Sequence, residues 1–153
     1  LMKKCVRKTL STFGGEDHRD KARGSRMLFG KKKQAPTVKL DGMVFKFDSS
    51  AQSWQTEYDG IFVSIEGKGL TLPIKPKLDG ILKVVDSHGT HINKMIDEMM
   101  WEGMNRGSAH LACIGVSGAD EFSVSYLGDD SWGDLGYDLW FKDGKIIKEG
   151  AGD

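Results

Sequence analysis

Three Asp-Gly dipeptides constrain the fold more than any other feature of this sequence. They occur at Asp41-Gly42, Asp59-Gly60 and Asp143-Gly144. Asp-Gly is favoured in two-residue hairpin turns because both positions of such a turn need a positive φ. Apolar and polar residues alternate in the segments beside these dipeptides. The sequence therefore predicts three β-hairpins, two early in the chain and one at its end.

The segments beside the turns have the period of two that half-buried strands show. Residues 37–48 and 54–65 are predicted to form two hairpins in an antiparallel meander. Further strands are expected over residues 111–116 and 122–126, and the last hairpin over residues 137–148.

A change of hydrophobic period marks the middle of the chain. From Leu78 to Met100, apolar residues recur at steps of three and four, which is the period of a helix. Pro76 suits the first turn of such a helix. We expect one long helix, kinked at His88-Gly89, or two helices in sequence. The fold class is therefore α+β, a mainly antiparallel sheet (meander plus C-terminal hairpin) packed against one long or kinked helix.

The formal net charge of zero conceals two parts of opposite sign. Residues 1–39 hold 12 Lys or Arg and 3 acids, a net charge of +9, which leaves −9 on the remainder. We expect residues 1–35 to be a basic, disordered segment and residues 36–153 to form one domain. A native start at Met27 is an alternative, because two apolar residues and a basic cluster follow that methionine.

The basic segment offers little for nucleic-acid recognition. Only Phe13 and Phe29 lie among its Lys and Arg residues, so it has few aromatic rings on which bases could stack. A basic protein is a better match for the acidic remainder of the chain. We expect a protein partner rather than a nucleic acid.

Cysteine usage and hydropathy predict a cytoplasmic protein. Cys5 and Cys113 lie far apart, and neither belongs to a C-x-x-C pair. Such usage favours a reducing compartment. No apolar run approaches the ~18 residues of a membrane-spanning helix, so no membrane association is expected.

Two clusters are candidates for metal chemistry. His88 and His91 lie three residues apart, but they do not form the His-Glu-x-x-His pattern of zinc peptidases. Asp129 and Asp130 could bind a hard cation, but their spacing is not that of an EF-hand. We therefore expect no catalytic residue, no metal and no cofactor. A metal-dependent enzyme that uses either cluster remains the alternative.

The loop over residues 128–136 is a candidate binding surface. Trp132 lies among Asp, Ser and Gly residues there. A tryptophan in such a loop either folds back onto the core or is displayed as an interface anchor. The candidate protein-binding surface comprises Asp129, Asp130, Trp132, Asp134, Tyr137 and Trp140.

The order of these segments carries a resemblance. A Trp-containing strand at 54–58, a Gly-bounded strand at 60–66, a long helix and a closing segment at 137–147 follow one another. This order resembles small bacterial domains of unknown function, some of which are immunity proteins of polymorphic toxin systems. The resemblance covers about residues 37–153. It implies a protein that binds and blocks a toxin and needs no catalytic residues.

The function expected from the sequence is therefore non-enzymatic protein binding. A toxin that acts on nucleic acid is often basic, and an acidic domain would complement its charge. A structural or oligomeric component is a further alternative, and the sequence does not indicate an oligomeric state.

Overall fold

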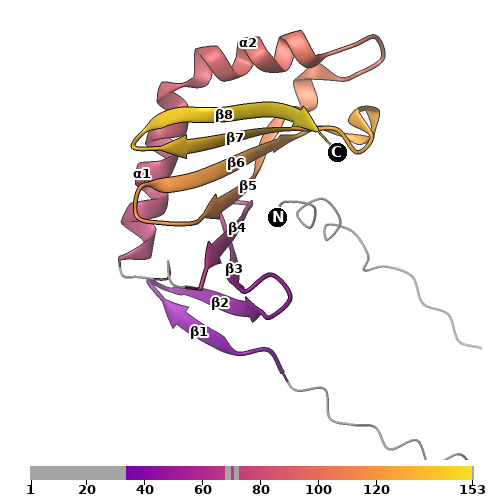
Figure 1. Ribbon diagram of the computed structural model, residues 1–153. Helices are drawn as coiled ribbons and strands as arrows, with labels where there is room; N and C mark the ends of the chain where they lie inside the picture. The colour runs from indigo at the N-terminus through magenta and orange to yellow at the C-terminus, as the bar shows by residue number, and fades with distance from the viewer. Residues whose placement is uncertain (1–33, 68–69, 71–72, 153) are drawn as a thin grey trace, which may run out of the picture.

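The computed structural model describes residues 34–67, 70 and 73–152. The expected basic segment over residues 1–35 and the alternative start at Met27 lie almost wholly outside this range. Within it, eight strands form one sheet and follow one another in chain order (Figure 1). The strands are β1 (Thr37–Leu40), β2 (Met43–Asp48), β3 (Ser53–Tyr58), β4 (Ile61–Glu66), β5 (His110–Val116), β6 (Glu121–Leu127), β7 (Gly136–Lys142) and β8 (Lys145–Gly152).

The three predicted Asp-Gly turns are confirmed. They connect β1 to β2, β3 to β4, and β7 to β8. Their aspartates, Asp41, Asp59 and Asp143, have φ values of 50°, 51° and 50°. The glycines that follow have φ values of 73–78°. Both positions are left-handed, as a type I′ turn requires.

The sheet consists of two antiparallel four-stranded meanders joined by one parallel pair. That pair is β4 with β5, in which Phe62 lies opposite Cys113 and Ile65 opposite Val116. Two helices, α1 (Ile74–Ser87) and α2 (Gly89–Met99), form the crossover between these strands. A crossover is needed because a short turn cannot connect parallel neighbours. The prediction of an α+β fold with a mainly antiparallel sheet is confirmed.

Of the two alternatives for this region, the single long helix is wrong, and the structure has two helices in sequence that meet at His88. This residue has φ −97° and ψ 6°, and it both ends α1 and precedes α2. Its ring lies edge-on to Phe141, with 5.4 Å between the ring centroids. Its Nε2 lies 3.0 Å from the carbonyl oxygen of Gly144. These contacts hold the bend against the β7–β8 hairpin, and Figure 1 shows α1 and α2 running in different directions.

The N-terminus of α1 is capped by a side chain from another part of the fold. The Asp41 carboxylate accepts hydrogen bonds from the backbone N–H groups of Ile74, at 2.7 Å, and Lys75, at 3.1 Å. Asp41 stands in the β1–β2 turn. Helix N-termini have unpaired N–H groups and a positive partial charge, so a carboxylate there is stabilising. The first predicted turn thus also fixes where α1 begins.

The apolar core lies between the helices and one face of the sheet. Val63 on β4 pairs with Ile114 on β5, and that row continues through Val124 to Leu139. Helical side chains pack against this row and its neighbours, and the buried ones are Ile74, Leu78, Ile81, Val85, Ile92 and Ile96. Among the described residues, neither helix is long and apolar enough to cross a membrane.

Candidate functional site

The loop that follows α2 exposes a tryptophan. Met100 ends the helix in an extended conformation, and its N–H donates to the Asp97 carbonyl at 3.3 Å. Trp101 comes next, and its carbonyl accepts from the Met104 N–H at 3.2 Å. Gly103 has φ 93°, a conformation that glycine adopts without steric cost. The Trp101 side chain is 62% exposed, and it was not among the binding residues that the sequence suggested.

Asn105 joins this loop to the loop over residues 128–135. Its backbone N–H donates to the Ser131 hydroxyl at 2.7 Å, and its side-chain amide donates to the Asp129 carboxylate at 2.7 Å. Its carbonyl accepts from the Trp132 indole N–H at 3.0 Å. Three different groups of one residue therefore hold two loops, more than 20 residues apart in sequence, in a fixed relation.

Trp132 is not displayed but buried. It is 3% exposed and belongs to the 3₁₀ helix η3 (Asp130–Trp132). Its ring covers Gly128 so closely that a Cβ atom there would lie 2.3 Å from the indole. A buried indole needs a partner for its N–H, and the Asn105 carbonyl supplies one. Of the two alternatives for this residue, folding back onto the core is confirmed.

Asp129 is engaged within the protein. It precedes η3, and its carboxylate accepts from the Ser131 N–H at 3.0 Å. Hydrogen bonds from the Ser131 hydroxyl and then from the Asn105 amide lower the pKa of Asp129 below its ordinary value of 3.8. Asp130 and Asp134 are exposed in the same loop.

The other two predicted binding residues lie on opposite faces of β7. Tyr137 is 2% exposed on the helix-covered face, and its hydroxyl donates to the Glu149 carboxylate at 2.9 Å. Burial, and then this hydrogen bond, raise the pKa of Tyr137. Trp140 is half-buried on the other face, where the Lys148 ammonium lies 4.7 Å from the centroid of its ring. The six residues proposed from the sequence therefore do not form one continuous surface.

The two histidines of the first metal candidate have separate partners. His88 contacts the β7–β8 turn, as described above, whereas His91 Nε2 lies 2.7 Å from the Glu149 carboxylate. Contact with His91 is the main cause of a lowered Glu149 pKa. Within the described residues, no group of three or more His, Cys, Asp or Glu side chains is arranged to hold a metal ion.

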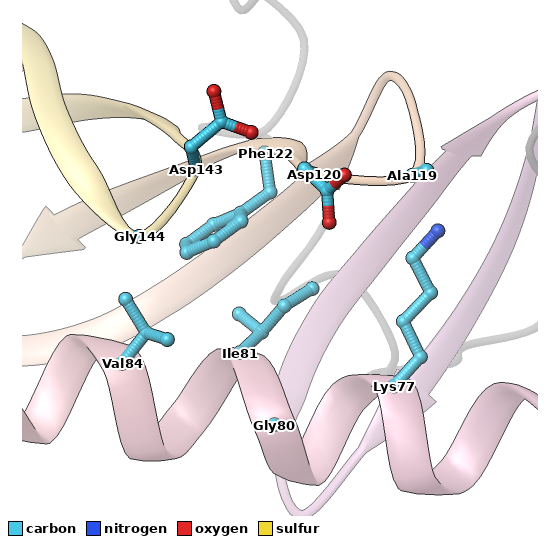
Figure 2. A pocket seen from close by; sticks show the side chains of 9 residues that line it. All are labelled: Lys77, Gly80, Ile81, Val84, Ala119, Asp120, Phe122, Asp143 and Gly144. Carbon is cyan, nitrogen blue, oxygen red and sulfur yellow. The ribbon is translucent and has the colours of Figure 1, made fainter.

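A pocket of about 290 Å³ lies between α1 and the turns that follow β5 and β7. Figure 2 shows Ile81 and Val84 extending from α1 toward Phe122 on the sheet side. The Lys77 ammonium at its edge donates to the Gly118 carbonyl at 2.9 Å, and the Asp143 N–H donates to the Asp120 carbonyl at 3.0 Å. These bonds hold the two turns beside the helix.

The exposed Trp101 and the acidic residues of the two loops that Asn105 joins make this end of the molecule the best candidate site. We define the Trp101 surface as the exposed tryptophan with the acids of its own loop and of the loop tied to it by Asn105. Its members are Trp101, Glu102, Asp129, Asp130 and Asp134. The neighbouring Asp97 pairs with Arg106, and Glu98 lies 3.6 Å from Lys94.

Comparison of the chain with protein-family models, with curated proteins and with solved structures gave no match.

Proposed function

We propose that this domain is a non-enzymatic module that binds a basic protein through the Trp101 surface, as an immunity-like inhibitor of a toxin would. The observation that carries the proposal is the 62% exposure of Trp101. Tryptophan is enriched among the few residues that dominate the free energy of protein association. An exposed indole on a structured loop is thus a suitable anchor.

Charge supports a basic partner. Glu102, Asp130 and Asp134 are exposed in the two loops that Asn105 joins. Carboxylates around an apolar anchor attract a positively charged partner and repel an acidic one, so they contribute chiefly to specificity and association rate. The aromatic anchor and the exposed acids of the two loops together favour a partner with an apolar pocket and nearby Lys or Arg.

The two loops are also well ordered relative to each other. The hydrogen bonds of Asn105 to Ser131 and Asp129 fix their separation before any partner binds. A rigid surface loses less conformational entropy on association than one that must be ordered. This supports a preformed binding surface.

The proposal is tested by affinity capture from an extract of the source organism, with the full chain as bait at low and at high salt. A captured basic protein is then titrated against the wild-type chain, Trp101→Ala and Ile147→Ala. Ile147 is the matched control, because it is also 62% exposed but lies on β8. We expect Trp101→Ala to weaken binding by about 30-fold, which corresponds to about 2 kcal/mol, and Ile147→Ala to leave it within about twofold.

The inhibitor role is tested separately. The captured protein should lose its own enzymatic activity when the wild-type chain is added, and retain it when the Trp101→Ala variant is added at the same concentration. Equal binding by the wild-type chain and by Trp101→Ala, or capture of basic proteins in proportion to their charge alone, would remove the support for the Trp101 surface.

A further inference from the structure

The pocket beside α1 is a second candidate site, at the opposite end of strands β5 to β8 from the Trp101 surface. The turns that follow β5 and β7 border the pocket. The loops that carry the Trp101 surface instead precede β5 and follow β6. Because these strands are antiparallel neighbours, the two turns lie at one end of the strands and the two loops at the other. The pocket can therefore be considered independently of Trp101.

Apolar side chains form the base of the pocket. Ile81 and Phe122 are buried there, and Val84 is half-buried. Figure 2 shows the two helical side chains extending toward Phe122, whose ring is held by stacking on Phe141 with 4.7 Å between the centroids. The volume of about 290 Å³ is at the lower end of the range for ligand pockets, about 300–1,000 Å³. The base therefore suits a small branched alkyl or phenyl group.

A glycine inside α1 keeps one side of the pocket open. Gly80 lies on the same helix face as Lys77 and Val84, at steps of three and four residues. Glycine weakens a helix interior relative to alanine. A Cβ atom at position 80 would meet nothing within 4 Å, so the packing of α1 does not require glycine there. The consequence of this glycine that the structure shows is space at the edge of the pocket.

Two carboxylates stand at the mouth of the pocket. Asp120 and Asp143 are exposed, and in the described part of the chain neither belongs to an ion pair. Lys142, beside Asp143, pairs instead with Glu121 at 2.7 Å. The Lys77 ammonium, at the other edge of the pocket, donates to a backbone carbonyl. The residues that line the pocket thus carry two negative charges and one positive charge, which favours a ligand with a positive charge.

The two acidic turns are fixed relative to each other before any ligand binds. The Asp143 N–H donates to the Asp120 carbonyl at 3.0 Å. Asp143 and Gly144 have φ values of 50° and 73°, as the type I′ turn of the last hairpin requires. A preformed site loses less conformational entropy on binding than one that must be ordered.

We propose that this pocket binds a small primary amine with a short apolar body. The ammonium group lies at Asp120 and Asp143, and the apolar body packs on Ile81, Val84 and Phe122. This site is additional to the protein-binding function proposed for the Trp101 surface and does not depend on it.

The test compares three probes of similar shape and different charge. The ¹⁵N-labelled full chain is titrated at pH 7 with 2-phenylethylamine, 2-phenylethanol and 3-phenylpropanoate, and binding is followed by NMR chemical shifts. We expect a Kd of about 1 mM for the amine. The alcohol and the acid should bind at least about tenfold more weakly, because they cannot form charge-assisted hydrogen bonds to the carboxylates. The shifted amides should lie in residues 77–84, 118–122 and 143–145.

Substitutions of the carboxylates test their role without removing the turns. Asp120→Asn and Asp143→Asn should each weaken binding of the amine by about fivefold and change binding of the alcohol by less than about twofold. Asn-Gly is as well suited to a type I′ turn as Asp-Gly, so the last hairpin should be retained. Asp59→Asn is the matched control, because it makes the same change in the Asp-Gly turn between β3 and β4. It should leave the affinity for the amine unchanged.

A second measurement fills the pocket instead of changing its charge. Gly80→Leu should weaken binding of the amine by at least about tenfold, because the new side chain takes the place of the ligand's apolar body. The melting temperature should rise by about 2–4 °C, since leucine favours a helix more than glycine does. A higher melting temperature would show that the loss of binding is not caused by unfolding. Equal binding of the amine and the alcohol, chemical-shift changes elsewhere on the protein, or wild-type affinity in Gly80→Leu would each overturn the proposal.

Discussion

Trp101 and Trp132 stand in loops joined by Asn105, yet one is 62% exposed and the other 3%. The difference does not follow from the loops' own composition, because both tryptophans lie among glycine and acidic residues. The difference in exposure follows from the groups that surround each indole. Trp132 finds a glycine without a side chain and a carbonyl for its N–H, whereas the turn of Trp101 directs the side chain to solvent. Burial of one ring organises the surface that displays the other.

The largest difference in stability is expected between Trp132→Ala and Trp101→Ala. Removing the buried ring should lower the free energy of unfolding by about 3–5 kcal/mol. Removing the exposed ring should change it by less than about 0.5 kcal/mol. Urea denaturation followed by circular dichroism measures both. Similar losses in the two variants would show that Trp101 is also part of the packed structure.

Gly128→Ala tests the same contact by enlarging the residue that the Trp132 ring covers. A methyl group at this position would lie 2.3 Å from the Trp132 indole, so the ring must shift. We expect a loss of about 1–3 kcal/mol, as for other overpacked sites. Gly150→Ala is the control, since a Cβ atom there meets nothing within 4 Å. Fluorescence should show Trp132 becoming more exposed in Gly128→Ala alone.

Asn105→Ala should loosen the connection between the two loops while leaving Trp132 its partner. The substitution removes the bond to Asp129 and the contact with the Gly107 N–H at 3.1 Å, but it retains the backbone N–H that donates to Ser131 and the backbone carbonyl that accepts from Trp132. We expect a loss of about 1 kcal/mol, typical of a removed cap. Thermal unfolding measures it. Binding by the Trp101 surface should weaken by more than this loss of stability explains if the fixed loop geometry matters.

Asp129→Asn is expected to have the smallest effect and one that depends on pH. The folded-state pKa of Asp129 lies below its ordinary value of 3.8, so the carboxylate stabilises the folded state above that pH. This contribution is lost as the pH falls through the lowered pKa. The difference in melting temperature between wild type and Asp129→Asn should therefore be constant near neutral pH and shrink below about pH 4. Asp130→Asn, in the same turn, is the control, and a pH-independent difference for Asp129→Asn would contradict the role of the ionised carboxylate.

Local sequence signals predicted the parts of the fold that depend on local geometry. Asp41, Asp59 and Asp143 each precede a glycine, and the left-handed conformation that they need limits the alternatives to a tight turn. The strand beside each turn then follows from alternation. The boundary at His88 was visible as a kink, but the change of helix direction depends on contacts with Phe141 and Gly144 from the last hairpin. No pattern near His88 carries that information.

The candidate site was predicted less well for the same reason. Whether Trp132 is buried depends on Gly128, on its own backbone and on Asn105, which lies 27 residues earlier in the chain. Whether Trp101 is exposed depends on where α2 ends. The glycine at 103, with its positive φ, was the available signal that the helix had ended before it. A glycine near the end of a helix indicates that the helix has ended before it. A large apolar residue between the last helical turn and that glycine, here Trp101, therefore does not belong to the buried face of the helix.

The parallel pairing of β4 with β5 has a consequence for how quickly the protein folds. Every other pair in the sheet connects strands that are joined by a turn or a short loop, whereas Phe62 meets Cys113 about 50 residues along the chain. Closing a loop of that length costs conformational entropy before any contact is gained. Each meander can form from short-range contacts, but the shared core cannot close until α1 and α2 have brought the two together. We expect this central pairing to be the slow step of folding, and substitutions in the interior of β4 or β5 to slow refolding more than those in the outer strands.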